Sequence, residues 1–506
     1  MVTPRWTMRD FAALRAAACL GLVLVGGPAA ADVHAARQPI DAAAAQAAQP
    51  LPEPSAAKLA VVSAVDRHAA DLAALSDRIW AYAEIALREH KSAAALADFA
   101  ERHGFRVQRG VAGMPTAFVA RYGQGRPVIG VMGEYDALPG LSQQAVAERA
   151  PLVEGAGGHG CGHNLFGAAS LGAAIAIKEQ IAAGRLRGTV IFFGTPAEED
   201  IGGKMYMVRD GLFDDVDAVL AWHPSDETQA DMTSSQAMVD LAVEFRGTAA
   251  HAAYDPWNAR SAVDALELFT HGVNLMREHV RPSSRMHYTI VAGGDVPNVV
   301  AEYAKAWLWL RDWKRSEVDD LLARVRKLAE GAATMTETSA TVTLQGGNWE
   351  TLLNEPGARL LHANLLWLGP AVYTEQEQAF AKQIQRATGV AEVGMFADVK
   401  PLEGQTEEGG STDVADVSWA APTLLVSVAT SPLGAPWHAW PVVASGGMSI
   451  GHKGMVRAAK VIAATMADLY EQPAALAAVQ ADFKARKGDT VYRPYIPAGP
   501  PPLPKD

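Results

Sequence analysis

The segment between Gly157 and Asn164 carries a thiol and two imidazoles that are separated only by glycines, in the order Gly-Gly-His-Gly-Cys-Gly-His-Asn. Glycine permits backbone conformations that other residues resist, so a tight loop here can direct several side chains at one point. Thiolate and imidazole are ligands of zinc and of neighbouring transition metals. Cys161 and His163 could instead form a cysteine nucleophile with its base. The loop alone therefore predicts either a metal site or a thiol-based active site.

Further polar groups follow two later segments that have the character of buried strands. Glu198 and Glu199 come after residues 188–193, and His223 comes directly after residues 217–222. In such a glutamate pair, one carboxylate can bind a metal ion while the other accepts a proton from metal-activated water. A catalytic thiol requires neither the pair nor the distant histidine, so the combination favours a metal centre. Its predicted ligands include thiolate, imidazole and carboxylate: Cys161, His163, Glu199 and His223.

The elements that must position these groups alternate between strand and helix. Apolar runs typical of buried strands occupy residues 127–133, 188–193 and 217–222, and a helix of small residues extends from the glycine-rich loop to about Ala183. Asp136 follows the first of these strands. Open α/β sheets bind their ligands at the carboxyl ends of strands. The sequence therefore predicts an α/β domain whose polar groups meet at one edge of its sheet.

From about Val239 the pattern changes to strands with one solvated face. The predicted order is strand, helix, strand, strand, helix, strand, which suits a small two-layer domain. After about Asn348 the chain returns to helix and to further polar segments, so this domain is predicted to be inserted. We predict the catalytic domain over residues 56–238 and 349–485 and the inserted domain over residues 239–348.

The N-terminus has the pattern of a secretory signal. Three arginines precede an apolar run over residues 16–25, and three alanines end at Ala31. We expect a signal peptide over residues 1–31, cleavage after Ala31 and a periplasmic or secreted protein, because the apolar run is short for a stable membrane anchor. A membrane-tethered N-terminus is the alternative. Residues 32–55 are predicted to be a disordered linker, and residues 486–506 form a Pro-rich tail.

Charge and cysteine content narrow the function further. The predicted signal peptide carries three Arg and one Asp, so its removal changes the net charge from −12 to −14. This balance argues against nucleic acid or an anionic membrane as the main partner. Removal also takes away Cys19 and leaves Cys161 as the only cysteine, which excludes an internal disulfide. A single free thiol would be oxidised in such a compartment, so we expect Cys161 to be occupied by a bound group.

Three motifs together resemble a known family. Residues 161–164, residues 195–199 with Gly202-Gly203, and Trp222-His223-Pro224 are similar to the co-catalytic metallopeptidases and amidohydrolases that include glutamate carboxypeptidase, aminoacylase and auxin-conjugate hydrolases. Residues 410–419 and 449–455 are typical of the p-aminobenzoyl-glutamate hydrolase branch. The resemblance covers about residues 60–475. It implies a catalytic domain with a mixed sheet flanked by helices and an inserted ferredoxin-like domain that serves as lid and in dimerisation.

The resemblance also implies roles for individual residues. Glu198 would be the general base, Asp136 would orient a ligand, and His251 and Asn298 would contact the substrate. Two divalent ions, zinc or manganese, would be held by five residues: Cys161, His163, Glu199, His223 and His438. His452 competes with His438 for the last position, and the Pro-Trp-His setting favours His438. His159 is expected to orient the loop, with a role as a further ligand as the alternative, and the role of Glu134 is left open.

The implied activity is metal-dependent hydrolysis of the amide bond of N-acyl or N-aroyl amino acids, of the p-aminobenzoyl-glutamate type. The alternatives are a metal-dependent carboxypeptidase or dipeptidase and a non-catalytic member of a hetero-oligomeric hydrolase. The expected partners are a small amide or peptide substrate and either a second copy of the chain or a related subunit.

Overall fold

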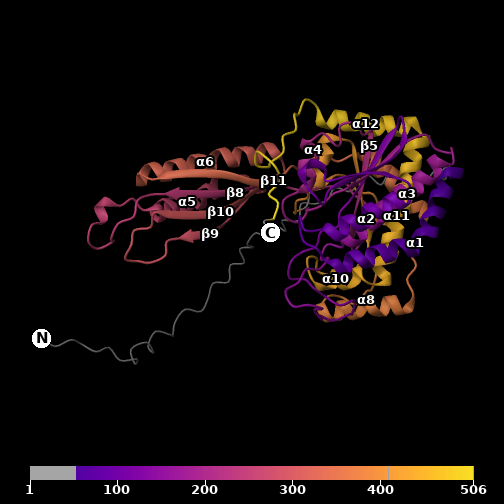
Figure 1. Cartoon of the computed structure of the whole chain (residues 1–506), viewed down its shortest axis with the longest axis horizontal. Helices are drawn as coiled ribbons and strands as arrows, with labels where there is room; N and C mark the ends of the chain where they lie inside the picture. Colours follow the sequence, from indigo (N-terminus) through magenta and orange to yellow (C-terminus); the bar gives the residue numbers. More distant parts are fainter. Residues whose placement is uncertain (1–52, 408, 505–506) are drawn as a thin grey trace, which may run out of the picture. The chain divides into compact units, whose positions relative to one another are not determined.

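The polar segments lie on a seven-stranded sheet in the computed structural model, which describes residues 53–407 and 409–504 (Figure 1). The predicted signal peptide and nearly all of the predicted linker lie outside the described residues. In spatial order the strands are β1 (Arg106–Arg109), β2 (Phe118–Gln124), β4 (Gly188–Gly194), β3 (Val128–Gly133), β5 (Ala218–Ser225), β13 (Thr423–Ala429) and β6 (Gln229–Ala230).

The four central strands β4, β3, β5 and β13 are parallel to one another, whereas β2 is antiparallel to β1 and β4. The predicted mixed sheet is therefore confirmed. Because β3, β4 and β5 are parallel neighbours, their carboxyl ends meet at one edge, as predicted from the sequence. All residues of β3 and β4 are buried, which explains their continuous apolar runs.

Helices flank this sheet. The helix α3 (His163–Ala182) packs against α1 (Ala56–Tyr82) and α11 (Ser449–Glu471), while α7 (Glu355–Leu368) contacts β13 and α12 (Pro473–Lys487) contacts β5. Among the described helices, α3 is the one long and apolar enough to cross a membrane, but 78% of its apolar window is buried inside the protein. Helices that are apolar on all sides are typical of a protein core, and α3 occupies that position here.

The inserted segment forms a separate four-stranded antiparallel sheet. Its order is β11 (Ser339–Asn348), β8 (Ala237–Arg246), β10 (Tyr303–Asp312) and β9 (Arg285–Gly293). The helices α5 (Ala262–Met276) and α6 (Arg315–Thr336) pack together, and both contact β8 and β10. The first and third strands of the segment are central, which is the ferredoxin-like βαββαβ arrangement that was predicted.

Shorter elements complete the fold: α2 (His90–Arg102), α4 (Gly203–Arg209), α8 (Glu375–Thr388), α9 (Val414–Ala420), α10 (Trp440–Gly446), β7 (Thr233–Ser234) and β12 (Thr406–Glu407). The helix α8 was not predicted, although it begins with a capping box between Thr374 and Glu377. The described part of the Pro-rich tail packs on the protein. Tyr492 donates a hydrogen bond to Asp416, and Tyr495 is buried in the core of the inserted domain.

A candidate metal centre at the sheet edge

The glycine-rich loop approaches β5 so closely that glycine is required. Gly162 has a φ of 75°, and a Cβ added there would lie 2.9 Å from Cβ of Pro224. A Cβ added at Gly158 would lie 2.1 Å from the carbonyl oxygen of Leu141. The first of these contacts brings the loop against the strand that carries His223, and the second packs the loop against Leu141. The glycines therefore position Cys161 beside that histidine.

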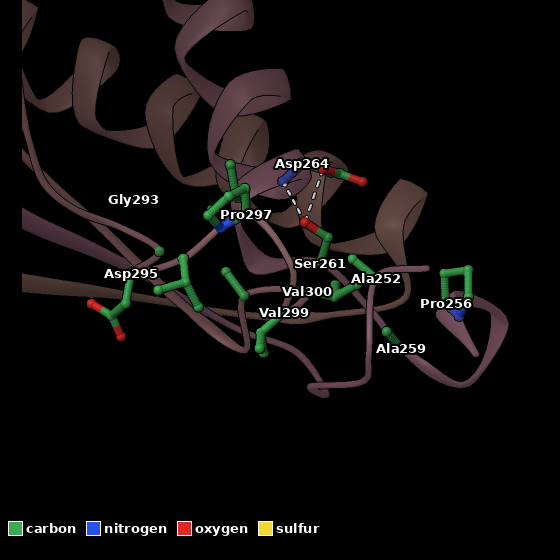
Figure 2. Close-up of a pocket in the computed structure, with 14 residues that line it drawn as sticks. Ala252, Pro256, Ala259, Ser261, Asp264, Gly293, Asp295, Pro297, Val299 and Val300 are labelled. Carbon is green, nitrogen blue, oxygen red and sulfur yellow. Dashed lines mark hydrogen bonds between the residues drawn. The ribbon is translucent and has the colours of Figure 1, made fainter. Parts of the chain in front are cut away.

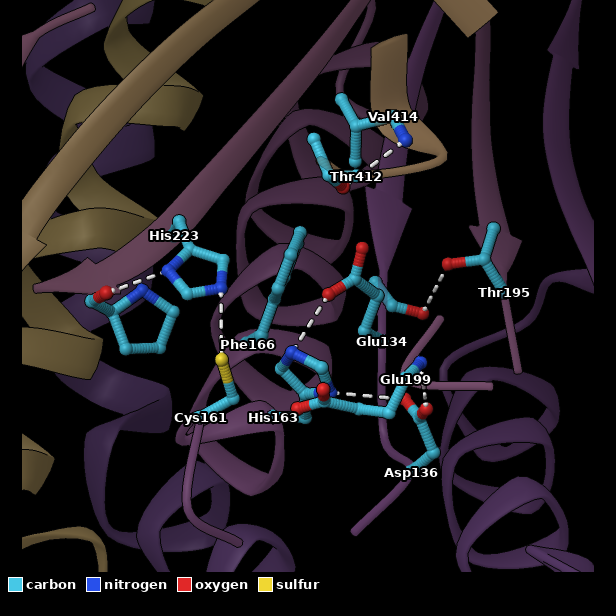
Figure 3. A network of polar contacts seen from close by, with 12 residues as sticks. Glu134, Asp136, Cys161, His163, Phe166, Thr195, Glu199, His223, Thr412 and Val414 are labelled. Carbon is cyan, nitrogen blue, oxygen red and sulfur yellow. Dashed lines mark hydrogen bonds and ion pairs between the residues drawn. The ribbon is translucent and has the colours of Figure 1, made fainter. Parts of the chain in front are cut away.

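His163, the first residue of α3, lies between two carboxylates that follow β3 (Figure 3). Its Nδ1 is 2.9 Å from Oδ1 of Asp136, and its Nε2 is 3.0 Å from Oε2 of Glu134. The other oxygen of Asp136 accepts a hydrogen bond of 2.9 Å from the backbone N–H of Glu199. Asp136 therefore joins two predicted ligands, in the position expected of a residue that orients them.

Cys161 is surrounded by ligands from distant parts of the chain. Its Sγ is 3.5 Å from Nε2 of His223 and 3.5 Å from Nε2 of His438. His438 Nε2 is also 3.6 Å from a carboxylate oxygen of Glu199. Three groups have ligand atoms that all lie within 4.8 Å of one another: Cys161 with His163 and His223, Cys161 with Glu199 and His438, and His163 with Glu198 and Glu199. The structure thus brings together all five predicted ligands and Glu198.

The tautomer of His223 suits a ligand. Its Nδ1 donates a hydrogen bond of 2.7 Å to the carbonyl oxygen of Pro224, so its Nε2 is free to accept a cation. Burial, reinforced by His163, lowers the pKa of His223 to about 4, which keeps the ring neutral. Neutral imidazole with its second nitrogen bound to a carbonyl is the form in which histidine binds metals.

The alternative of a thiol nucleophile is less well supported by the geometry. Burial raises the pKa of Cys161 to about 12, and the nearby glutamates add to this effect. Reactive cysteines lie in environments that lower the pKa of the thiol. The carboxylates beside Cys161 disfavour a free thiolate and attract a cation, so they favour a role in binding a cation over a role as nucleophile.

A buried lysine balances part of the negative charge. Lys204 on α4 has a fully buried side chain, and its Nζ is 2.6 Å from both Glu134 Oε1 and Asp413 Oδ1. Its backbone N–H also donates to Asp413. Although burial raises the pKa of Glu134, Lys204 and His163 hold it well below its usual range. Glu134, whose role was left open, is therefore an ionised partner of both Lys204 and His163.

Lys204 was not predicted from the sequence. In the sequence, Lys204 is a single charged residue between Gly203 and the apolar run Met205-Tyr206-Met207-Val208, and this is the feature that could have indicated its burial. Such a lysine on a short helix is usually exposed. Asp413 belongs to the polar segment over residues 410–413 that the sequence did single out.

Glu198 and Glu199 line a cavity of about 620 Å³ together with Cys161, His223 and His438. Burial raises the pKa of Glu198 well above its usual range, and the charges of Glu134 and Asp413 act in the same direction. A carboxylate with a raised pKa is a better proton acceptor in catalysis than one with an ordinary pKa. Phe166, Trp222 and Trp437 line the same cavity, and of these Trp437 is partly exposed while the other two are buried.

Two residues of the centre have backbone conformations that are unusual for their type. Ala197, directly before Glu198, has a φ of 62°, and His438 has a φ of 51°. The backbone N–H of Ala197 donates to the buried carboxylate of Glu89, and that of His438 donates to the carbonyl of Gly160. Left-handed residues other than glycine cluster at functional sites, where surrounding contacts hold them. These hydrogen bonds hold the backbone in place, and they thereby fix the directions of the Glu198 and His438 side chains.

The predicted substrate-binding residues lie together in the inserted domain, away from the lining of the metal cavity. His251 and Asn298 are exposed, and the backbone N–H of Ala252 donates to the carbonyl of Asn298. Nδ1 of His251 accepts hydrogen bonds from the backbone N–H groups of Ala253 and Tyr254, so its Nε2 carries the proton. A hollow of about 610 Å³ beside them includes Ala252, Val299 and Val300 (Figure 2). Their contact with substrate remains a prediction.

The two uncertain histidines have other partners. His452, in the first turn of α11, has its Nε2 2.8 Å from Asp77, and it belongs to none of the three ligand groups among the described residues. His159 is fully buried, and its Nε2 is 3.0 Å from the carbonyl oxygen of Ile79. Burial lowers the pKa of His159 to about 4. These contacts place His159 as a neutral link between the loop and α1.

Comparison with known proteins decides the family. Residues 130–423 match the model of peptidase family M20/M25/M40. The chain belongs to this family. It is 39% identical to one of the subunits of p-aminobenzoyl-glutamate hydrolase from Escherichia coli, over 85% of this chain and 95% of the relative. It is 29% identical to the Xaa-Arg dipeptidase of Mus musculus over 83% and 91% of the two chains.

Solved structures of M20/M25/M40 peptidases and their relatives share the fold. A dinuclear metal-binding M20 peptidase from Bacillus subtilis has a TM-score of 0.57 at 17% identity, covering 80% of this chain and 99% of that one. An aminobenzoyl-glutamate utilization protein from Klebsiella pneumoniae has a TM-score of 0.53 at 18% identity, covering 78% and 96%. As a member of the M20/M25/M40 family, the protein is a metal-binding hydrolase of amide bonds.

Proposed function

We propose that the protein hydrolyses the amide bond of N-acyl or N-aroyl amino acids, of the p-aminobenzoyl-glutamate type, with two divalent ions at the sheet edge. One observation carries the proposal. Two ligand groups share Cys161, one completed by His163 and His223 and the other by Glu199 and His438. Glu198 lines the same cavity. This arrangement offers two neighbouring positions for cations beside a carboxylate that can accept a proton.

The residues fit such ions by their chemistry. The set combines sulfur, imidazole nitrogen and carboxylate oxygen, which zinc accepts and which manganese accepts in part. Glu199 Oε1 is buried and has no hydrogen-bond partner among the described residues. When bound, two divalent ions supply Lewis-acid polarisation of the scissile carbonyl and of the attacking water.

The side chains of the protein would perform the remaining steps. Glu198 accepts a proton from the attacking water and transfers it to the nitrogen of the leaving amine. Asp136 holds His163 and Glu199 in position through one carboxylate. His251, with its protonated Nε2, would donate a hydrogen bond to the oxyanion that forms at the carbonyl.

The substrate class is supported by the relatives and by the cavity. The Escherichia coli relative that aligns over most of this chain is named for the hydrolysis of p-aminobenzoyl-glutamate. Of the aromatic side chains that line the cavity, Trp437 is partly exposed, which suits an aromatic acyl group. Dipeptide hydrolysis is the second candidate, because the Mus musculus relative is a dipeptidase.

We further propose that the chain is exported and that it assembles either with itself or with a related subunit. The basic and apolar residues before Ala31 support export. The name of the Escherichia coli relative describes it as one subunit of its enzyme. The other named subunit of that enzyme is also similar to this chain, with 30% identity over 49% of this chain and 61% of that subunit. Because Glu198 and the complete ligand set are present, a purely non-catalytic role is disfavoured.

Metal content and a substrate panel test the proposal together. The purified protein should contain about two divalent ions per chain and should hydrolyse N-aroyl-glutamates faster than N-acyl aromatic amino acids and dipeptides. Faster cleavage of dipeptides would assign the second candidate. Cys161→Ser should weaken metal binding. Unchanged metal content with loss of turnover would instead support the thiol nucleophile.

A further inference from the structure

A groove of about 550 Å³ lies between α1, α11 and the segment that connects α7 to α8. Its walls are largely apolar, with Ala69 and Ala70 from α1 and Pro370 and Val372 from the connecting segment. Among the described residues, none that lines this groove also lines the metal cavity. The groove is therefore a second concave site, which the proposed hydrolysis does not use.

Four basic side chains of α11 line this groove, and three of them have an acidic partner. The pairs are Lys453 with Glu377 at 2.6 Å, Lys460 with Asp66 at 2.6 Å, and His452 with Asp77 at 2.8 Å. The fourth, Arg457, forms no ion pair or hydrogen bond with any residue in the described ranges 53–407 and 409–504. The groove therefore holds one cation that the described part of the protein does not balance.

Arg457 is also the most deeply buried of the four. It is only 9% exposed, and its Nε and Nη2 are shielded from solvent without a hydrogen-bond partner. It lies one helical turn from both Lys453 and Lys460, so their charges do not compensate it. A buried guanidinium without partners is costly, and buried charges in proteins are ordinarily paired. Within the described ranges, the charge of Arg457 thus has no anionic partner.

We propose that this groove binds a small carboxylate with an apolar body, whose carboxylate pairs with Arg457. The unbalanced charge is a single positive one, which matches a monoanion. A guanidinium forms strong charge-assisted hydrogen bonds with a carboxylate. The alanine, proline and valine side chains of the walls match an apolar ring or chain. Inorganic phosphate, with more negative charge and no apolar part, fits less well.

Thermal shift and calorimetry on the full chain test the proposal with four probes: benzoate, its neutral analogue benzamide, acetate and inorganic phosphate. Benzoate is expected to bind and to raise the melting temperature, with at least tenfold weaker binding for benzamide and acetate. Arg457→Met should weaken benzoate binding at least tenfold. Lys460→Met, which removes a paired cation from the same groove, should weaken it less than threefold.

The unliganded variant supplies an independent readout. Because Arg457 has no partner among the described residues, Arg457→Met should unfold at the same temperature as the parent protein or at a higher one, whereas loss of a structural ion pair would lower it. Arg457→Lys retains the charge without the guanidinium and should bind benzoate more weakly than the parent, even if the methionine variant does not fold. Benzoate binding that persists unchanged in the Arg457 variants, or tighter binding of phosphate, would overturn the proposal.

Discussion

The metal cavity and the Arg457 groove both contain buried charge that the described part of the protein does not balance, but the signs are opposite. Around the cavity, the carboxyl groups of Glu134, Asp136, Glu198, Glu199 and Asp413 outnumber the cationic partners Lys204 and His163. In the groove, Arg457 is the cation left over after three others have found carboxylates. Buried charges require a partner, so we expect the cavity to bind cations and the groove to bind an anion.

The two regions also differ in how firmly their charged groups are held. In the cavity, Asp136 and Glu134 fix both nitrogens of His163, and Lys204 fixes Glu134. In the groove, Arg457 makes no such bond among the residues described. A preorganised set suits chemistry that requires defined geometry, whereas a single arginine suits simple binding. The following predictions test this contrast.

The largest effect is expected from Glu198→Ala. Loss of the proton acceptor should reduce kcat about 10²–10⁴-fold, the range typical for a general base. Metal content should not change, because Cys161, His163, His223, Glu199 and His438 remain. Measured kcat with metal analysis of the same sample checks this, and retained activity would remove Glu198 from the proposed role.

Lys204→Met should destabilise the protein by about 3–5 kcal/mol, because it leaves the buried carboxylates of Glu134 and Asp413 without a cation. Lys460→Met is the matched control. Its partner Asp66 is more than half exposed, so the expected loss is about 0–1 kcal/mol. Urea unfolding of both variants measures the difference. Equal losses of unfolding free energy in the two variants would show that burial does not increase the contribution of the Lys204 ion pairs to stability.

Asp136→Asn should weaken metal binding about 10–100-fold, the effect typical of residues that orient metal ligands. The asparagine keeps the size of the side chain but cannot accept hydrogen bonds through both of its polar atoms. Competition with a chelator of known affinity measures the change. Unaltered affinity would mean that His163 and Glu199 hold their positions without Asp136.

Glu377→Gln should have the smallest effect, and that effect should depend on pH. Burial raises the pKa of Glu377, but the hydrogen bonds from Lys453 and the Thr374 backbone outweigh it and lower the pKa to about 2. A carboxylate with a depressed pKa stabilises the fold above its unfolded value of about 4.5, and this stability is lost as the pH falls toward 2. The variant should therefore be about 1–2 kcal/mol less stable at pH 7, with a smaller deficit at pH 3.

Glutamine can still complete the capping box with Thr374, so this substitution isolates the charge of Glu377. Glu375→Gln, at an exposed position in the first turn of the same helix, is the control and should show a smaller deficit at pH 7. Urea unfolding at pH 7, 4 and 3 gives the comparison. A deficit that is constant over this range would assign the effect to packing.

The fold and the composition of the cavity could be predicted because their signals are local. Buried parallel strands are continuous apolar runs, and the polar residues after β3 and β4 and near the end of β5 are visible against them. Lys204 and Arg457 could not be predicted in the same way. A lysine before Met205 and an arginine between Lys453 and Lys460 have the pattern of solvated helix surface.

The order of residues was sufficient to define which chemical groups this protein has available: a thiol, imidazoles and a glutamate pair beside strand ends. Only the folded chain decided which of them meet, because Cys161 and His438 are 277 positions apart and yet 3.5 Å from each other. The tertiary structure also decided that Lys204 has partners and that Arg457 has none within the described ranges. Distance and burial determine the energy of a charge, and both arise from contacts between segments that are remote in sequence.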